Sequence, residues 1–425
     1  MLPIYTEYTH HLAVLEEYVS RSLLSEDALL ETICQDVRLR GDEALISYSH
    51  QFDKIDPHTF SMTVSQEDIQ TAYDLLEPSV IEALRVAYRN IVGFHQHQLP
   101  TNWTDSPAPG VQYGMVYHPI DRVGLYVPGG RAVYPSSVLM NAIPAQLAGV
   151  PTRVMVTPPQ PNGSVHPALL VAAHLCGISH IFKVGGAQAI FALAYGTSTI
   201  PAVDKIVGPG NTYVTLAKKK VFGHVAIDKP AGPSEVIVYC DTVAYATFAA
   251  SELLAQLEHD PDAIAIAVCT SQAIVSAIQD AFVHQLDYCT RKDIICQSVM
   301  QSGIWLVSSE EIAINAINEV ACEHVVLLSE RASLLVDHIR HGASIFVGPY
   351  SPVALGDYVA GPNHVLPTNR GARFASPLGV MDFMTFSSVL EYSKEALEKV
   401  APTIKVLSKV EGLDAHFQSV SQRLG

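Results

Sequence analysis

The stretch ASELLAQLEHDPD, residues 250–262, places two potential metal ligands at the end of a predicted helix. Its leucines repeat at helical spacing and give the segment one apolar stripe. Gln256 and His259, three residues apart, would lie on a neighbouring face. Pro261 disfavours helical geometry at the residue before it, so we expect the helix to end close to His259.

An amide oxygen and an imidazole are two of the donors that a zinc ion accepts. Zinc sites are normally tetrahedral with N, S or O ligands, and a zinc ion that binds substrate keeps a position open. Gln256 and His259 could therefore form half of such a site, with the other donors supplied elsewhere in the chain. The alternative is a polar, solvated helix end, and these two residues alone favour it because His is common on helix faces.

Further polar groups follow in the second half of the chain. Glu323 and His324 directly precede the apolar run VVLL, and a carboxylate beside an imidazole could transfer protons near neutral pH. An exposed loop dipeptide explains this pair equally well. The segment GDYVAGPNHVLPT presents Asp357, Asn363 and His364 in a loop that glycine and proline would hold.

Short apolar strands alternate with helices from Val116 onward, which predicts parallel strands joined by crossover helices. The first set has the strands VGLYVPGG, RVMVTPP, HIFKVGG, VDKIVGPGN and HVAID, separated by helices over residues 136–147, 168–175, 187–194 and 212–220. The second set has the strands AIAIAVCT, GIWLVSS, HVVLLSE and SIFVGPY, with helices over residues 272–285, 310–319 and 332–339. The fold class expected from this alternation is α/β.

Three strand ends of the first set are rich in glycine: Gly129-Gly130, Gly185-Gly186 and Gly208-Pro209-Gly210-Asn211. Ligands of open α/β sheets bind at the carboxyl ends of strands, where glycine lets the backbone approach a phosphate or a ring. A tight turn is enough to explain any one of these glycine-rich strand ends. The three together fit a nucleotide-sized ligand and ordinary tight turns about equally well. The GxGxxG fingerprint is absent from all three, so a standard Rossmann cofactor pose is not supported.

The N-terminal region is predicted to be mainly helical, with helices over residues 28–37, 42–51 and 65–90. The Pro- and Gly-rich residues 100–110 are typical of a boundary or an exposed loop.

The C-terminal region beyond Gly371 is also predicted to be helical. Val389, Tyr392, Ala396 and Val400 repeat at spacings of three and four, which gives a helix one apolar stripe. The segment EGLDAHFQSV then carries Glu411 and His416 on what we expect to be an ordinary terminal arm.

Composition excludes several classes of protein. The 425 residues, 48% hydrophobic and 16% charged, indicate a globular protein of two or three domains. No apolar run approaches the roughly 20 residues of a membrane span, and the N-terminus shows no signal or transit peptide, so we expect a cytoplasmic protein.

The net charge of −16 argues against a general nucleic-acid surface, and Lys218-Lys219-Lys220 is expected to be a solvated helix face. Seven scattered cysteines without a CxxC pair are expected to be reduced thiols.

Eight segments resemble the histidinol dehydrogenase family, in the same order and over nearly the whole chain. They are VGLYVPGGRAVYPSSVLMNAIPAQLAG, KVGGAQAIFALAYGT, DKIVGPGNTYVTLAKKKVFG, IDKPAGPSEVIV, LLAQLEHDPDA, ACEHVVL, GDYVAGPNHVLPT and EGLDAHFQSV. The resemblance implies a homodimeric enzyme that takes histidinol through an aldehyde to histidine by two successive NAD-dependent oxidations at one zinc-containing site.

The resemblance also assigns roles to residues, one by one. The zinc ligands would be Gln256, His259, Asp357 and His416, and the catalytic acid/base pair would be Glu323 and His324. These residues would surround the substrate together with Ser234, His364 and Glu411, and NAD would contact Tyr126, Gln188 and Asn211. His364, Glu411 and His416 would complete a site whose other residues come from the partner protomer, so a monomer is expected to be inactive.

The implied fold has two doubly wound Rossmann-like domains with a helical N-terminal segment and a helical C-terminal arm. The expected divisions are residues 1–105, which pack with the third region, 106–235 and 236–370 for the two Rossmann-like domains, and 371–425 for an arm that reaches the partner's site.

The sequence departs from the family pattern at Cys322, where proline is expected, at Leu257, where a small residue is expected, and at Met384-Thr385-Phe386, where the family is usually basic. None of these is a proposed ligand or catalytic group. Two alternatives stay open: a dihydroxypropane sulfonate dehydrogenase on the same scaffold, against which Glu411 argues because its carboxylate suits an amine, and a zinc hydrolase, against which the glycine-rich strand ends argue.

Overall fold

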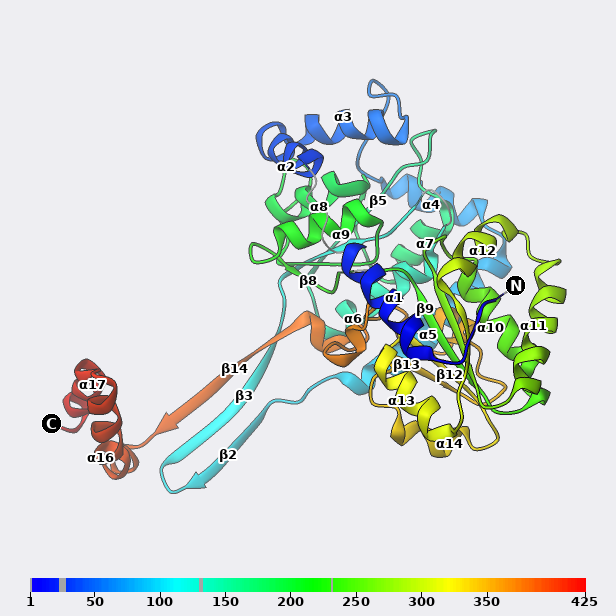
Figure 1. The fold of residues 1–425 in the computed structure, drawn as a ribbon. Coiled ribbons are helices and arrows are strands. Elements are labelled where there is room, and N and C mark those ends of the chain that lie inside the picture. Colours follow the sequence, from blue (N-terminus) through cyan, green and yellow to red (C-terminus); the bar gives the residue numbers. More distant parts are fainter. Residues whose placement is uncertain (1, 23–27, 130–132, 231) are drawn as a thin grey trace.

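A computed structural model describes residues 2–22, 28–129, 133–230 and 232–425, and these form three β-sheets covered by helices (Figure 1). Two of the sheets are parallel and one is antiparallel. Sheet A has six strands in the order β1 (Ile4–Tyr5), β11 (Gly303–Leu306), β10 (Ile264–Cys269), β9 (Glu235–Cys240), β12 (His324–Leu328) and β13 (Ser344–Val347). Sheet B has five in the order β6 (His180–Lys183), β5 (Thr152–Thr157), β4 (Arg122–Tyr126), β7 (Lys205–Val207) and β8 (Ala226–Ile227).

Sheet B is doubly wound, because helices bury the apolar side chains of both its faces. One face packs against α6 (Pro135–Ala148) and α7 (Pro167–Leu175), and the other packs against α8 (Gly186–Tyr195) and α9 (Thr212–Val221). Strands covered on both faces read as continuous apolar runs, as VMVT in β5 does.

Sheet A is built in the same way, so both predicted doubly wound sheets are confirmed. One of its faces packs against α10 (Ala246–Leu257), α11 (Gln272–Leu286) and α12 (Lys292–Ser298). The other packs against α1 (Tyr8–Ser22), α13 (Glu310–Val320) and α14 (Ala332–Leu335). Serine side chains cap α11 and α13, where Ser271 accepts from the backbone N–H of Ile274 and Ser309 from that of Ile312.

The N-terminal region divides its packing between the two sheets. β1 and α1 belong to sheet A, whereas α2 (Ala28–Arg40), α3 (Asp42–Asp53), α4 (Gln66–Leu75) and α5 (Pro78–His95) pack on sheet B. The single helix predicted over residues 65–90 was wrong. Pro78 lacks the backbone N–H that a helix interior needs, so it begins a new helix and α4 ends before it.

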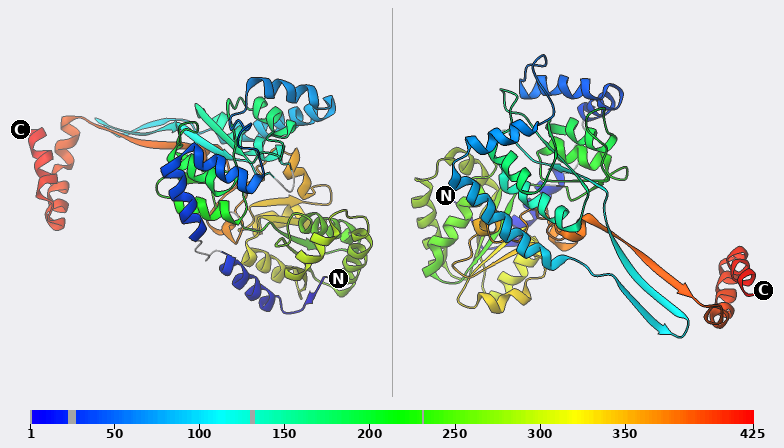
Figure 2. Two further views of the ribbon diagram at one scale, coloured as in Figure 1. Left: turned by 90° about the horizontal axis from the view of Figure 1, so that it is seen from above. Right: turned by 180° about the vertical axis from the view of Figure 1, so that it is seen from behind.

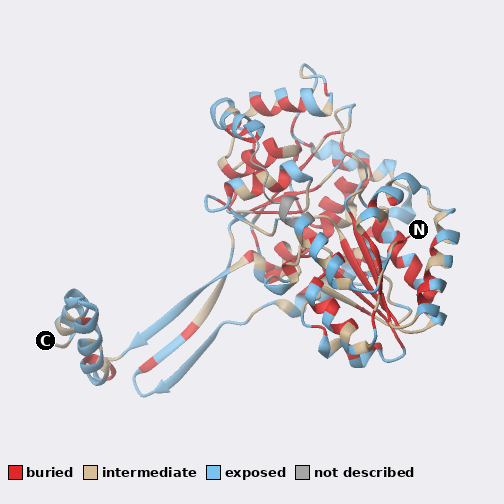
Figure 3. Ribbon diagram, in the orientation of Figure 1, coloured by how far each residue is buried: buried red, intermediate tan, exposed pale blue. Residues whose placement is uncertain are grey.

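An arm projects from the two sheets and carries the C-terminal helices at its far end, in every view (Figures 1 and 2). Its shaft is sheet C, made of β14 (Met384–Tyr392), β3 (Val111–Pro119) and β2 (Trp103–Ala108). Its end is made of α16 (Lys394–Glu411) and α17 (Asp414–Leu424). Burial differs accordingly: the central strands β9, β10 and β12 of sheet A are buried, whereas the arm is mostly exposed (Figure 3).

The shaft corrects two predictions. Residues 100–110 contain a strand, and Val389 and Tyr392 lie on β14, not on a helix with Ala396 and Val400. The residues of MTFSSVLEY pair in antiparallel register with β3 over the whole length of β14, and this long-range pairing outweighs the helical spacing of a few apolar residues. The helix begins only after Ser393, whose hydroxyl caps it.

Other expectations have simple outcomes. All seven cysteines are free, as expected, and most are buried. Among the described residues, no helix is long and apolar enough to cross a membrane.

The helix α10 begins at Ala246 and ends at Leu257, so His259 lies in the turn after the helix and not on its last turn.

Candidate active site

Glu323 and His324 lie at the amino ends of the sheet A strands. His324 opens β12, and the neighbouring strand β9 opens with Glu235. Ser234 directly precedes this strand, and its carbonyl oxygen accepts from the backbone N–H of Ile264 at 2.9 Å. Ligands of doubly wound sheets generally bind at the opposite, carboxyl ends of strands. The predicted catalytic residues of sheet A thus lie at the end of the sheet opposite to the one named by this rule.

The two nitrogens of His324 have different tasks. Its Nδ1 lies 3.0 Å from the backbone carbonyl oxygen of Glu235. A carbonyl can only accept, so Nδ1 must carry the proton, and the neutral ring keeps its Nε2 lone pair free. His324 is buried, with 7% of its surface exposed, and Nε2 is the atom able to take a proton from a substrate.

Glu323 lies close to the same ring nitrogen. Its Oε1 lies 3.3 Å from Nδ1 of His324 and accepts the backbone N–H of Glu235 at 2.8 Å. Burial alone would lower the pKa of His324. The charge and hydrogen bond of the Glu323 carboxylate act in the opposite direction, and the pKa of His324 lies above its ordinary value. The pair is thus suited to accept protons and to hold an imidazolium.

Asp357 and His364 lie beside this pair. Nδ1 of His364 is 3.1 Å from the carbonyl oxygen of Asp357 and 3.9 Å from its carboxylate, and Nε2 is 3.5 Å from the Ser137 hydroxyl on α6. Burial lowers the pKa of His364, with the charges of Asp357, His324 and Glu323 acting on it. The neutral imidazole is therefore the stable form. Its Nδ1–H donates to the Asp357 carbonyl oxygen, so Nε2 is the nitrogen that can accept a hydrogen bond.

Asn363 has a structural task in the same loop. Its amide donates to the carbonyl oxygen of Met140 at 2.7 Å, and its side-chain oxygen accepts the backbone N–H of Val365 at 2.9 Å. These bonds fix the loop to α6 and so place His364.

The end of α10 supplies the amide of the predicted metal site. Gln256 is buried, and among the described residues its Nε2 has no hydrogen-bond partner. One turn earlier, Glu252 accepts the backbone N–H of Val353 at 3.0 Å, which ties α10 to the start of α15 (Val353–Tyr358), and Asp357 follows one turn later. His259 is exposed.

The chemistry of these donors fits zinc. An amide oxygen, an imidazole and a carboxylate are all zinc ligands. The buried Gln256 amide, whose nitrogen has no partner among the described residues, is a polar group that a bound ligand would satisfy. In the described part of this single chain, no three His, Cys, Asp or Glu side chains are arranged to hold a metal ion.

Glu411 and His416 are the predicted site residues that the chain does not bring to sheet A. Glu411 ends α16 and His416 lies on α17, and both are exposed. These two helices lie at the far end of the arm, well away from the helices and strands of sheet A in every view (Figures 1 and 2).

Tyr126, Gln188 and Asn211, the predicted cofactor residues, gather at the carboxyl end of sheet B. The Tyr126 hydroxyl accepts the backbone N–H of Gly186 at 3.2 Å, and Gln188 lies buried in the first turn of the same helix. Asn211 caps α9 by accepting the N–H of Val214 at 3.1 Å. Gly130, the second residue of the Gly129-Gly130 strand end, lies outside the described residues.

Gly208 is the glycine with the clearest backbone reason. Its φ is +115°, and a Cβ atom there would lie 2.0 Å from the Tyr126 carbonyl oxygen. The loop after β7 can therefore approach β4 only without a side chain at this position.

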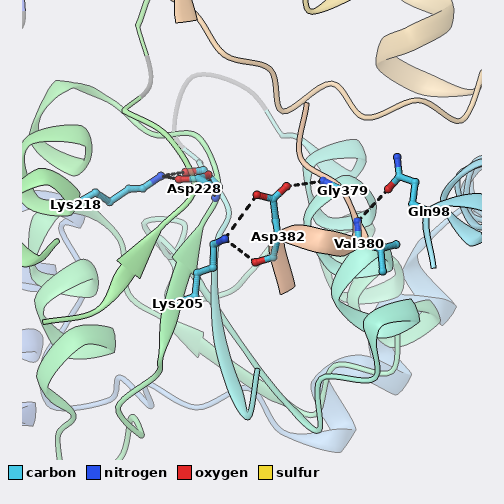
Figure 4. A network of polar contacts seen from close by, with 8 residues as sticks. Gln98, Lys205, Lys218, Asp228, Gly379, Val380 and Asp382 are labelled. Atoms are coloured by element: carbon cyan, nitrogen blue, oxygen red, sulfur yellow. Dashed lines mark hydrogen bonds and ion pairs between the residues drawn. The ribbon is translucent and has the colours of Figure 1, made fainter. Parts of the chain in front are cut away.

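Two buried charges hold this loop, and sequence reasoning missed both. Lys218 donates to the carbonyl oxygen of Gly208 at 3.0 Å and pairs with Asp228, whose other carboxylate oxygen accepts the N–H of Gly208 at 2.8 Å (Figure 4). The expectation that Lys218 is solvated was wrong, since it is 1% exposed. Lys220 on the same helix pairs with Glu31 near the surface.

Glu235 and Glu252 were also missed. The signal available in the sequence is a carboxylate in an otherwise apolar element: Glu235 opens the strand EVIVYC, and Glu252 lies in the helix ATFAASELLAQL. Buried carboxylates at such positions mark functional sites more often than chance.

The comparisons with known proteins cover nearly the whole chain. The family model for histidinol dehydrogenase matches residues 21–424. A histidinol dehydrogenase of Oceanobacillus iheyensis is 45% identical over 392 residues, covering 92% of this chain and 91% of that protein, and one of a Synechococcus strain is 44% identical, covering 100% and 99%. The crystal structure of histidinol dehydrogenase from Elizabethkingia anophelis is 36% identical, covers 100% of this chain and 98% of that one, and superposes with a TM-score of 0.94. With a family-model match over nearly its full length and with both parallel sheets in place, the chain belongs to the histidinol dehydrogenase family.

Proposed function

We propose that the protein oxidises L-histidinol through L-histidinal to L-histidine, using two molecules of NAD, in the last step of histidine biosynthesis. The observation that carries this proposal is the buried Glu323–His324 pair, in which the backbone carbonyl of Glu235 leaves Nε2 of His324 free. Each of two oxidations of an alcohol or a hydrate releases a proton, and a fixed imidazole beside a carboxylate suits both.

His324 and Glu323 would divide the proton transfers. Nε2 of His324 would take the hydroxyl proton of histidinol, and later that of the hydrated aldehyde. The second oxidation also needs a water molecule, and the Glu323 carboxylate is near enough to His324 to activate it.

Zinc would be held by Gln256, His259, Asp357 and His416. Its chemistry would be that of a template, which binds the imidazole and amine of the substrate and so orients the alcohol. Ser234, His364 and Glu411 would contact the substrate, and the Glu411 carboxylate would suit its ammonium group. The pairing of Asp357 with His364 supports a common site for the metal and the substrate.

NAD would lie at the carboxyl end of sheet B, against Tyr126, Gln188 and Asn211, where it accepts hydride when bound. The loop that follows Gly208 approaches the backbone of Tyr126 and ends at Asn211, and Lys218 with Asp228 holds Gly208 in its positive-φ conformation. The residues of sheet B would therefore bind and orient the cofactor, and those of sheet A would manage protons.

A homodimer would complete the site, with the arm of each chain reaching its partner. The arm supports this in two ways. Val406, Leu407 and Val410 on α16 are more than half exposed, as are Phe386 and Leu390 on β14, which is unusual for apolar side chains without a covering partner. The arm also carries the two predicted site residues that remain far from their own sheet A.

The cytoplasm is the compartment we propose, and seven free thiols support it, because reduced cysteines are typical of reducing compartments.

Mixing two inactive variants tests the shared site. His259→Ala and His416→Ala proteins should each be inactive, and after subunit exchange a heterodimer regains one intact site. We expect activity to reappear on mixing, up to about a quarter of wild type if exchange is random and complete. Exchange without recovered activity would contradict the shared site.

A further inference from the structure

Glu235 is a buried carboxylic acid beside the catalytic pair that the proposed function does not use. It is 5% exposed and opens β9 at the same edge of sheet A as His324. In the parallel register His324 pairs with Val236, so Glu323 and Glu235 precede that pair on adjacent strands. Neighbouring strands lie about 4.8 Å apart, so the two carboxylates are lateral neighbours.

The side chains of these residues divide between the two faces of the sheet. Val236 and Val326 pack in the core beneath α10, and Ile237 and Val325 pack in the core beneath α1 and α13. Successive residues of a strand point to opposite faces. His324 therefore belongs to the α10 face, where the substrate would lie, and Glu235 belongs to the α1 face.

The α1 face contains a small cavity at Glu235. Its volume is about 30 Å³, which is room for about two water molecules at most. Leu12, Leu15, Ile264, Ile266 and Cys322 are among its walls, and Glu16 and Arg370 line it as well. Glu16 and Arg370 form an ion pair and are partly exposed, so the cavity reaches solvent beside them.

The hydrogen bonds of Glu235 are incomplete in a way that points to a proton or a water molecule. Its Oε1 accepts the backbone N–H of Asn369 at 3.2 Å, whereas Oε2 is buried without a partner among the described residues. The side-chain oxygen of Asn369 is in the same condition. Two buried acceptors with no donor need hydrogens from elsewhere, which a protonated Glu235 and cavity water would supply.

The backbone that closes the cavity is strained. Asn369 and Arg370 have φ values of +54° and +64°, which residues other than glycine rarely adopt. This conformation directs the Asn369 N–H to Glu235 and the Arg370 side chain to Glu16. Strain of this kind concentrates at functional sites.

We infer that Glu235 is a proton relay, which takes a proton from Glu323 and passes another to water in the cavity beneath α1. The inference rests on the proposed function. It adds an exit for protons on the face of sheet A opposite to the substrate, so that the second oxidation can follow the first while the substrate stays bound.

The proton balance shows why an exit is needed. In the first oxidation the alcohol loses hydride to NAD and its hydroxyl proton to Nε2 of His324. Hydration of the aldehyde then adds water: the carbonyl oxygen takes the proton from His324, and Glu323 takes a proton from the attacking water. His324 is thus neutral again, but Glu323 is a carboxylic acid. Glu235 accepts that proton on one oxygen and releases its own from the other, which restores both groups. The Glu323 carboxylate, 3.3 Å from Nδ1 of His324, is then charged again to stabilise the imidazolium that forms when His324 takes the proton of the second oxidation.

The test compares Glu235→Gln with wild type in single-turnover reactions that start from histidinol. Glutamine keeps the shape of the side chain but cannot relay a proton. The first NADH should form at the wild-type rate, and the second should form on the order of tenfold or more slowly. The slow phase should show a larger solvent deuterium isotope effect than wild type, which a merely structural change would not produce. KM for histidinol should stay the same.

Two further variants control the experiment. Cys322→Ala changes the same cavity wall without removing a relay group, so both NADH phases should stay at wild-type rates. Leu15→Phe fills the cavity while leaving Glu235 in place, and it should slow the second phase as Glu235→Gln does. It also provides the answer if Glu235→Gln does not fold.

The outcomes separate the two proposals. A second phase that keeps the wild-type rate and isotope effect in Glu235→Gln, or in Leu15→Phe, would overturn the relay while histidinol oxidation stands. Wild-type protein that forms no NADH from histidinol would overturn the proposed function and the relay with it.

Discussion

Lys218→Met removes a buried charge that holds the loop after β7, and we expect it to destabilise sheet B strongly. Lys218 and Asp228 side chains are each 2% exposed. Without the lysine, Asp228 keeps the N–H of Gly208 but loses its ion-pair partner. Removal of one partner from a buried ion pair costs about 3–5 kcal/mol.

The assay must report on sheet B itself. The two tryptophans are Trp103 on the arm and Trp305 in sheet A, so tryptophan fluorescence would not follow this region. Hydrogen–deuterium exchange of peptides from β4 and β7 reads it directly. A loss of about 3–5 kcal/mol corresponds to amide exchange about 10²–10⁴ times faster, if exchange occurs through opening of this sheet.

Lys220→Met is the matched control, because it removes a lysine two residues away on the same helix. Its partner is Glu31, and the two side chains are 38% and 51% exposed. An exposed pair contributes roughly 0.2–1 kcal/mol, so exchange should accelerate by no more than about fivefold.

A double variant separates the charge from the volume. Lys218→Met with Asp228→Asn removes both charges, and the asparagine side-chain oxygen can still accept the N–H of Gly208, so no unpaired charge is left buried. Most of the lost protection should therefore return. Exchange in Lys218→Met within about fivefold of wild type, or a double variant that is worse than the single one, would refute the reasoning.

Four further predictions test other parts of the site. Glu323→Gln should slow histidinal oxidation more than histidinol oxidation, whereas His324→Asn should slow both by roughly 10²–10⁴-fold. Single-turnover rates that start from each substrate measure these effects. If Glu323→Gln slowed both oxidations equally, the division of tasks between the two residues would be contradicted. Chelation should abolish activity with little change in far-UV circular dichroism, and loss of cooperative melting would mean that the metal is structural. Gly208→Ala should raise KM for NAD, because its Cβ atom would lie 2.0 Å from a carbonyl oxygen; an unchanged KM would show that the loop is not at the cofactor. Burial and the nearby Glu323 raise the pKa of Glu235 to about 8 from 4.5, so between these pH values the folded state keeps a proton that the unfolded chain releases. The free energy of unfolding should therefore fall as the pH rises from 4.5 to about 8. Urea unfolding of Glu235→Gln should lack this fall.

The sequence predicts the parts of the fold that follow from local patterns. Continuous apolar strands alternate with capped helices, so both parallel sheets follow from periodicity and turn residues. The arm does not follow, because β14 exists through pairing with β3, more than 260 residues earlier in the chain. Its serines and exposed apolar residues give no stronger local preference for a strand than for a helix.

The candidate site divides in a similar way. The resemblance points to Glu323 and His324. These two residues are consecutive in the sequence, so their proximity does not depend on the tertiary structure. The roles of Glu235 and Lys218 depend on which strand lies beside which, and on which side of an element a charge faces. A single charged residue in a sequence has both interpretations, solvated or buried with a partner, and only the tertiary structure decides between them.

The measurement that tests the central claim most directly is the amount of NADH formed per molecule of L-histidinol when NAD is in excess. Two NADH and one L-histidine per histidinol, with none formed from dihydroxypropane sulfonate, is the predicted result. One NADH with released aldehyde, or no NADH from histidinol, would contradict a two-step oxidation at this site.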